Sequence, residues 1–101
     1  MGLTEARRRF DKTRGTARVL VSDHAWRDHP ERGFTVPEIV SLIRHAPGQL
    51  RDNQAPSAQA GSFLFRCKDK ADRPCELIVK FETDMKTGEV IVVVSAYRRV
   101  R

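Results

Sequence analysis

Three segments rich in β-branched and aromatic residues follow one another in the C-terminal half of the chain, and short turn-forming stretches join them. Neighbouring strands with such short connections pair antiparallel, and Gly88 suits a hairpin turn. Alternation in the second segment predicts one buried and one wet face. The third is apolar on both sides from Val90 to Val94, which predicts a place in the sheet interior beneath a helix. The segments cover residues 62–67, 75–83 and 89–97.

The segment Phe34-Thr35-Val36-Pro37-Glu38-Ile39 has the pattern of a helix start. Thr35 can accept a hydrogen bond from the backbone N–H of Glu38 while Glu38 reaches back, which forms a capping box, and Phe34 can pack on Ile39. A helix is therefore expected from here to Pro47. An earlier helix is expected over residues 3–14, with an apolar stripe of Leu3, Ala6 and Phe10. A second, short helix is expected to carry residues 24–27, with Ser22 or Asp23 as its cap and an end near His29.

The remaining segments are less regular. Residues 16–22 read as an edge strand or an extended lead into the next helix, and the polar residues 47–60 as a long loop of a kind that is often functional. We expect an α+β fold in which N-terminal helices pack on one face of a three- or four-stranded antiparallel sheet. We expect residues 1–101 to form one domain, with 1–18 as a basic helix or arm and 19–101 as the core.

Charge and composition restrict the classes of partner and the cellular setting that we expect. The chain has 19 Lys and Arg against 13 Asp and Glu, a net charge of +6, which favours acidic partners such as nucleic acid. No apolar stretch is long enough to cross a bilayer or to act as a signal peptide, so a cytoplasmic setting without a membrane partner is expected. Cys67 and Cys75 flank one strand connection, and we expect free thiols rather than a disulfide framework or a zinc site.

His24 is the first candidate for chemistry because Arg27 and Arg32 follow it closely. Imidazole moves protons near neutral pH and arginine neutralises phosphate, so the trio is typical of a phosphate-ester site. The alternative is a histidine that only makes local hydrogen bonds at a helix start. His24 and His29 are spaced so that a regular helix turns them apart, and neither metal ligation nor a cofactor is expected, since nucleotide-binding motifs are absent.

A second basic group surrounds the last strand. Tyr97, Arg98 and Arg99 follow its apolar run, and together with Arg66 and Lys80 they are expected to line a basic cleft at the end of the sheet. Such a cleft favours nucleic acid, with Tyr97 or Trp26 stacking on a base. Solvated terminal arginines and a wet sheet face explain the same residues without a ligand.

Several of these residues also carry a family resemblance. The run His24-Ala25-Trp26-Arg27 through Arg32-Gly33-Phe34-Thr35, then Glu38-Ile39-Val40, and the closing Val92-Val93-Val94-Ser95-Ala96-Tyr97-Arg98 resemble a family of small bacterial domains. These domains are similar in layout to the RelE/BrnT and colicin-type ribonuclease toxins, whose helices pack on a four-stranded antiparallel sheet. The resemblance covers about residues 20 to 99 and leaves out the basic N-terminal helix.

The resemblance implies a toxin-like, metal-independent endoribonuclease with an acidic antitoxin as partner. It implies that His24 acts as acid or base, that Arg32 and Arg98 hold the phosphate, and that Tyr97 orients or stacks. In this chain Asp28 stands where the family has arginine, with Arg27 one place earlier. We expect Arg27, Arg66, Lys80, Tyr97 and Arg99 to contact the RNA.

Two alternatives belong to other functional classes. In the first, the same basic surface binds nucleic acid or protein without catalysis. In the second, the chain is an interaction domain whose edge strand, over residues 62–67, pairs with another chain.

Overall fold

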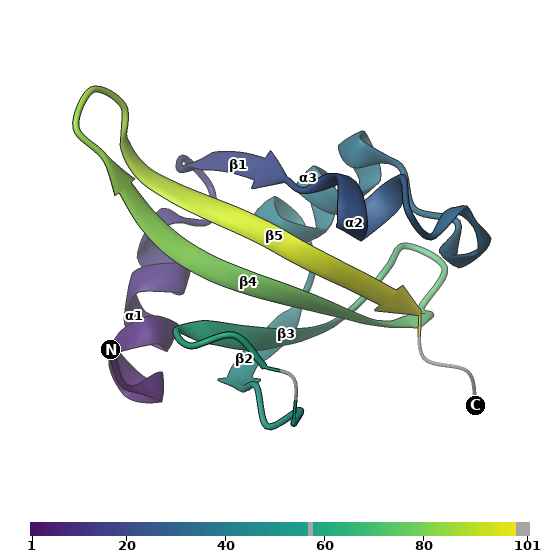
Figure 1. Cartoon of the computed structure of the whole chain (residues 1–101), viewed down its shortest axis with the longest axis horizontal. Helices are drawn as coiled ribbons and strands as arrows, with labels where there is room; N and C mark the ends of the chain where they lie inside the picture. Colours follow the sequence, from purple (N-terminus) through teal and green to yellow (C-terminus); the bar gives the residue numbers. More distant parts are fainter. Residues whose placement is uncertain (57, 99–101) are drawn as a thin grey trace.

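Five strands form one sheet in the order β1-β5-β4-β3-β2 (Figure 1). The computed structural model describes residues 1–56 and 58–98. The elements in chain order are α1 (Leu3–Thr13), β1 (Arg18–Val21), α2 (Asp23–Trp26), the 3-10 helix η1 (Pro30–Arg32), α3 (Val36–His45), β2 (Gly48–Asp52), β3 (Ser62–Lys68), β4 (Pro74–Asp84) and β5 (Gly88–Arg98). Within the described ranges, no helix is long and apolar enough to span a membrane.

The expected C-terminal meander is confirmed. Strands β3, β4 and β5 pair antiparallel, and Gly88 closes the β4–β5 hairpin with a positive φ of 84°. Strand β5 lies in the sheet interior between β4 and β1, which explains its apolar residues on both faces. Cys67 and Cys75 are cross-strand partners, and both are free, buried thiols.

The expected size and pairing of the sheet were wrong: it has five strands and is mixed. Strand β1 adds to β5 in parallel, with Val21 opposite Val93. Strand β2 follows α3 and lies inside the segment that was expected to be a loop. It buries only Leu50, so its sequence lacks the alternation of apolar and polar residues that identifies a strand. Because β2 covers β3, residues 62–67 are not an edge strand; the edges are β1 and β2.

The helices lie on one face of the sheet and bury one core against it (Figure 1). The inward residues of the strands alternate as expected, and Phe10 of α1 packs on Phe65 of β3 with ring centroids 4.8 Å apart. The largest fully buried side chains are Phe10, Phe65, Ile39, Ile43, Leu77, Ile91, Val79, Val93 and Cys75. The predicted stripe of α1 is therefore its core-facing side.

The basic N-terminal segment is a docked helix rather than a loose arm. The Nε of Arg9 lies 2.6 Å from the carboxylate of Glu89 on β5. Arg14 donates to the carbonyl oxygens of Leu42, Ile43 and Ala46 at the C-terminal end of α3. The last carbonyls of a helix lack the usual partners within it, and here only that of Leu42 also accepts from the backbone N–H of Ala46. Arg14 therefore joins two helices while it caps one of them.

The sheet face opposite the helices is called the outer face below. Among the described residues no helix packs across it, although α1 and α2 contribute side chains to hollows on it. Side chains alternate between the two faces along each strand, and those that point away from the helices form this face. Most of them are half-buried. They mix aliphatic and charged side chains: Leu20, Arg51, Leu64, Arg66, Glu76, Ile78, Lys80, Val92 and Tyr97. The loop between β2 and β3 crosses the near side of this face in Figure 1.

Candidate functional site

A hollow of about 190 Å³ lies on the outer face where α2, the β2–β3 loop and β5 meet. His24 from α2 and Tyr97 from β5 both line it, and the loop adds Asn53 and Gln59. Its floor comes from the strands: Ile78, Val94 and Ser95. We call this the histidine hollow.

A β-bulge in β5 decides which side chains reach the histidine hollow. Ile78 of β4 pairs with Ser95, whereas the next residue of β4, Val79, pairs with Val93, so Val94 has no partner. The extra residue reverses the alternation in the last part of β5. As a result Ser95 and Tyr97 lie on the outer face, while Ala96 and Arg98 lie on the helix side.

His24 is exposed and available for proton transfer. Its side chain is 53% exposed, and its Nδ1 lies 3.7 Å from a carboxylate oxygen of Asp28. On the other side of the ring, Nε2 has no hydrogen-bond partner within residues 1–56 and 58–98. The expectation that His24 and His29 turn apart was wrong: their rings meet edge to face with centroids 4.7 Å apart, because the helix ends at Trp26 and the chain turns back.

Arg32 supplies a positive charge beside the hollow by stacking on Tyr97. Its guanidinium carbon lies 4.3 Å from the centroid of the Tyr97 ring, and its Nη1 donates to the carbonyl oxygen of Ala96 at 3.3 Å. Tyr97 is 38% exposed, so the other face or edge of the ring stays open. The sequence placed His24, Arg32 and Tyr97 in one site, and the structure brings them together.

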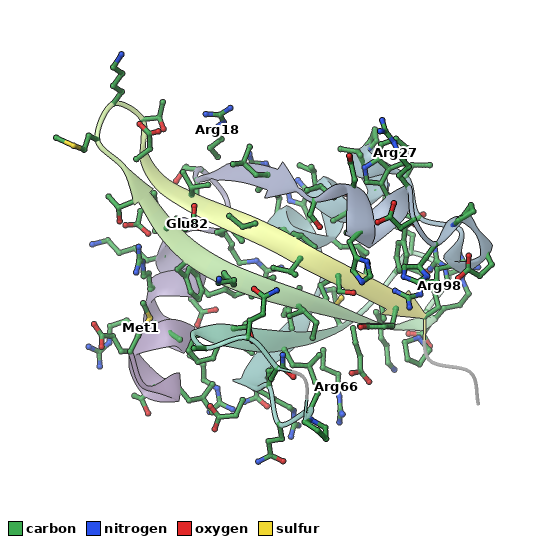
Figure 2. The ribbon with its side chains drawn as sticks, viewed as in Figure 1. Met1, Arg18, Arg27, Arg66, Glu82 and Arg98 are labelled. Atoms are coloured by element: carbon green, nitrogen blue, oxygen red, sulfur yellow. The ribbon has the colours of Figure 1, made fainter. Side chains whose placement is uncertain are left out.

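Arg98 lies away from this group, on the helix side of the sheet. Its guanidinium pairs with Glu38 at 2.5 Å and with Asp69 at 2.7 Å, and it stacks on Phe34 at 4.3 Å. In Figure 2 Arg98 lies at the C-terminal end of β5. With two carboxylates already bound, it is not free to hold a phosphate in this arrangement.

The same contacts complete only half of the expected capping box. Thr35 accepts from the backbone N–H of Glu38 at 3.2 Å, as predicted, but the Glu38 side chain binds Arg98 instead of reaching back. Asp69 accepts from the backbone N–H groups of Ala71 and Arg73 as well. Burial by itself raises the pKa of Asp69, but these hydrogen bonds and the charge of Arg73 outweigh it, and the pKa lies below its usual value.

The other basic residues are spread over the molecule. Lys80 is next to the histidine hollow and donates to Gln59 at 3.4 Å, whereas Arg66 lies further across the outer face, 3.8 Å from Glu76. Arg27 is directed elsewhere: it stacks on Trp26 at 5.3 Å and pairs with Asp23 at 3.5 Å. Arg99 lies outside the described residues.

Sequence reasoning missed Ser95 and the loop residues of the hollow. Ser95 is 4% exposed, and its hydroxyl has no hydrogen-bond partner among the described residues. A serine inside an apolar strand was the available signal, but only the bulge places it under the hollow. The unusual length of the polar segment 47–60 was the signal for Asn53 and Gln59.

No three His, Cys, Asp or Glu side chains gather into a metal-ligand set within residues 1–56 and 58–98. The histidine hollow itself offers an imidazole and a phenol, and the guanidinium of Arg32 lies beside it. Comparison with protein-family models, with curated proteins and with solved structures finds no match for this chain.

Proposed function

We propose that the protein is a metal-independent endoribonuclease that cuts single-stranded RNA at the histidine hollow. One observation carries the proposal: an exposed imidazole and a tyrosine line one hollow on the outer face, and an arginine stacks on that tyrosine. A general base, a stacking ring and a phosphate-binding cation are the groups that this reaction needs.

In the proposed reaction the ribose 2′-oxygen attacks the adjacent phosphorus and the bond from phosphorus to the 5′-oxygen breaks. The 2′-hydroxyl proton passes to Nε2 of His24, and the leaving 5′-oxygen takes a proton from water at the open site. His24 then returns its proton to solvent. The products are a 2′,3′-cyclic phosphate and a free 5′-hydroxyl. Acid–base help of this kind contributes roughly 10² to 10⁴ in rate.

The positioning groups differ from the set expected from the resemblance. Arg32 takes the phosphate-binding role alone, with Lys80 as the nearest further cation, since Arg98 is bound by Glu38 and Asp69. Asp28 serves as the partner on the Nδ1 side of His24. The 3.7 Å separation is longer than a hydrogen bond, so Asp28 acts as a nearby charge on that side of the ring.

Kinship with the RelE/BrnT-like toxins is part of this proposal. Its support is the arrangement of helices on one face and an open opposite face, together with the motif around His24. The net charge of +6 is compatible with an acidic antitoxin as partner.

The test is incubation of a mixed RNA pool with the purified protein in excess EDTA, followed by sequencing of the fragment ends. Wild type should give cyclic-phosphate ends, and His24→Ala should lower the rate at least about a hundredfold. His45→Ala is the matched control, because His45 is an exposed histidine on α3, and it should cut like wild type. Cutting by His24→Ala at the wild-type rate would refute the assignment. RNA binding without any product would support the binding module instead.

A further inference from the structure

A second and larger hollow lies on the same outer face, beyond the histidine hollow. Its volume is about 520 Å³, within the range of small-molecule sites. Three arginines line it: Arg7 of α1, Arg51 of β2 and Arg66 of β3. Leu3 and Leu64 give it an apolar wall, and we call it the arginine hollow. In Figure 2 Arg66 lies beside the β2–β3 loop.

The arginines of this hollow have unused donors. The Nε of Arg7 donates a hydrogen bond to the carbonyl oxygen of Leu50, and Arg51 is exposed. Arg66 is 41% exposed and 3.8 Å from Glu76, and its Nε is buried without a hydrogen-bond partner among the described residues. A buried donor left unpaired costs free energy, and a rotation of this half-exposed side chain would present it to an incoming acceptor.

The composition of the hollow favours a nucleotide over a bare anion. The carboxylates of Asp52 and Glu76 offset two of the three positive charges, so a small free anion gains little there. Asp52 and the amide of Gln54 match the hydrogen-bonding edges of a base, while Leu64 offers it an apolar surface. The amide of Asn53 is held by Ser62 and Ala55.

The arginine hollow is continuous with the histidine hollow. Asn53 and Ala55 line both of them. One row of cross-strand partners, Arg66, Glu76 and Tyr97, runs between them from β3 to β5. Two strand spacings are about 10 Å, which corresponds to about three stacked nucleotides at roughly 3.4 Å each.

We infer that the arginine hollow binds a nucleotide of the RNA strand whose other end occupies the histidine hollow. Arg51 and Arg66 contact its phosphate, and Leu64 packs against its base. The inference rests on the proposed function for the identity of the ligand, but not on cleavage. It requires that binding strengthen once a strand is long enough to reach both hollows.

The test uses fluorescence anisotropy with 2′-O-methyl RNA, which cannot be cut because its 2′-oxygen is blocked. Dimers, tetramers and octamers are titrated against wild type, Arg51→Gln and Arg66→Gln. Wild type should bind the octamer more tightly than the dimer. Each variant should lose at least about threefold in octamer affinity, with a salt slope smaller by about 0.7, while its dimer affinity stays that of wild type.

Lys86→Gln is the control, since it removes one exposed positive charge in the β4–β5 turn from a residue that lines neither hollow. Octamer binding no tighter than dimer binding, or an equal loss in Lys86→Gln, would overturn the inference. The two proposals can fail separately. If affinity rises with RNA length but natural RNA is not cut, the inference stands and the proposed nuclease activity is refuted. If natural RNA is cut but affinity does not rise with length, the nuclease activity stands and the inference is refuted.

Discussion

Arg98 holds the end of β5 to α3 and to the β3–β4 loop through two carboxylates. Its side chain is 18% exposed, and that of Asp69 only 6%. Removing the cation leaves Asp69 buried without its charge partner from β5, which is costly. We therefore expect Arg98→Met, which keeps the aliphatic length, to lower the free energy of unfolding by about 3 kcal/mol in urea titrations.

The matched control for this prediction is Arg27→Met, because the Arg27–Asp23 pair is 64% exposed on both sides and should contribute less than about 0.5 kcal/mol. At a temperature where it is still folded, Arg98→Met should also keep its affinity for 2′-O-methyl RNA. If Arg98→Met left stability unchanged but abolished RNA binding, Arg98 would be a residue of the binding site instead.

Tyr97 and Arg98 show how far single residues could be assigned from the sequence. They are neighbours in a strand, and neighbouring side chains lie on opposite faces, so they could not share one site. Which of the two faces the histidine hollow depends on the bulge at Val94, and a bulge has no reliable signature in an unbroken apolar run. His24 was easier to find, because a short helix with nearby arginines is a local pattern.

At the scale of elements, α1 is attached to the sheet mainly through Phe10. This ring is 1% exposed and packs on Phe65 and Phe81 with centroids 4.8 and 6.3 Å away, and Arg14 stacks on its face. A helix of this length is marginal without tertiary contacts. Phe10→Ala should lower the free energy of unfolding by about 3–5 kcal/mol, measured by urea titration of the far-UV circular dichroism.

The control is Arg8→Ala, an exposed position on the same helix, with an expected change within about 0.5 kcal/mol. Native-state hydrogen exchange adds a second measurement, since the amides of α1 should open with the rest of the core. If Phe10→Ala cost no more than Arg8→Ala, α1 would be peripheral to folding.

The elements predicted with one reading only are α1, α3 and the three meander strands, which have a periodic apolar pattern, and the short helix α2. Residues 16–22 had two readings, and the edge strand is the one that the structure shows. Strands β1 and β2 lie at the edges of the sheet, where each pairs with one neighbour only. Their apolar and polar residues alternate weakly. Strand β1 also finds its partner β5 at the other end of the chain, and no local pattern specifies such a contact. The sheet was therefore expected to be smaller than it is.

At the scale of the whole molecule, the carboxylates that help stability at neutral pH are spread over several elements. The hydrogen bond from Arg9 holds the pKa of Glu89 below its usual value, and the backbone N–H groups of Lys86 and Thr87 do the same for Asp84. A pKa lowered by folding stabilises the protein above the unfolded value near about 4, and this contribution is lost as the pH falls.

Burial of the core thiols affects the stability of the fold at alkaline pH. It raises the pKa of Cys67 to about 12, and it also raises that of Cys75. A thiol whose pKa is raised on folding contributes stability in full below its unfolded value, near about 9. That stability is lost as the pH rises toward the folded value, because the unfolded chain ionises first.

Stability should therefore be greatest between about pH 5 and pH 9, although the isoelectric point is near 10.0. Urea midpoints measured from pH 3 to pH 11 test this. Glu89→Gln should flatten the acid limb and leave the alkaline limb unchanged, whereas Cys67→Ala should flatten the alkaline limb alone. A maximum at the isoelectric point, unaffected by either variant, would mean that the net charge of the whole molecule governs stability rather than these individual groups.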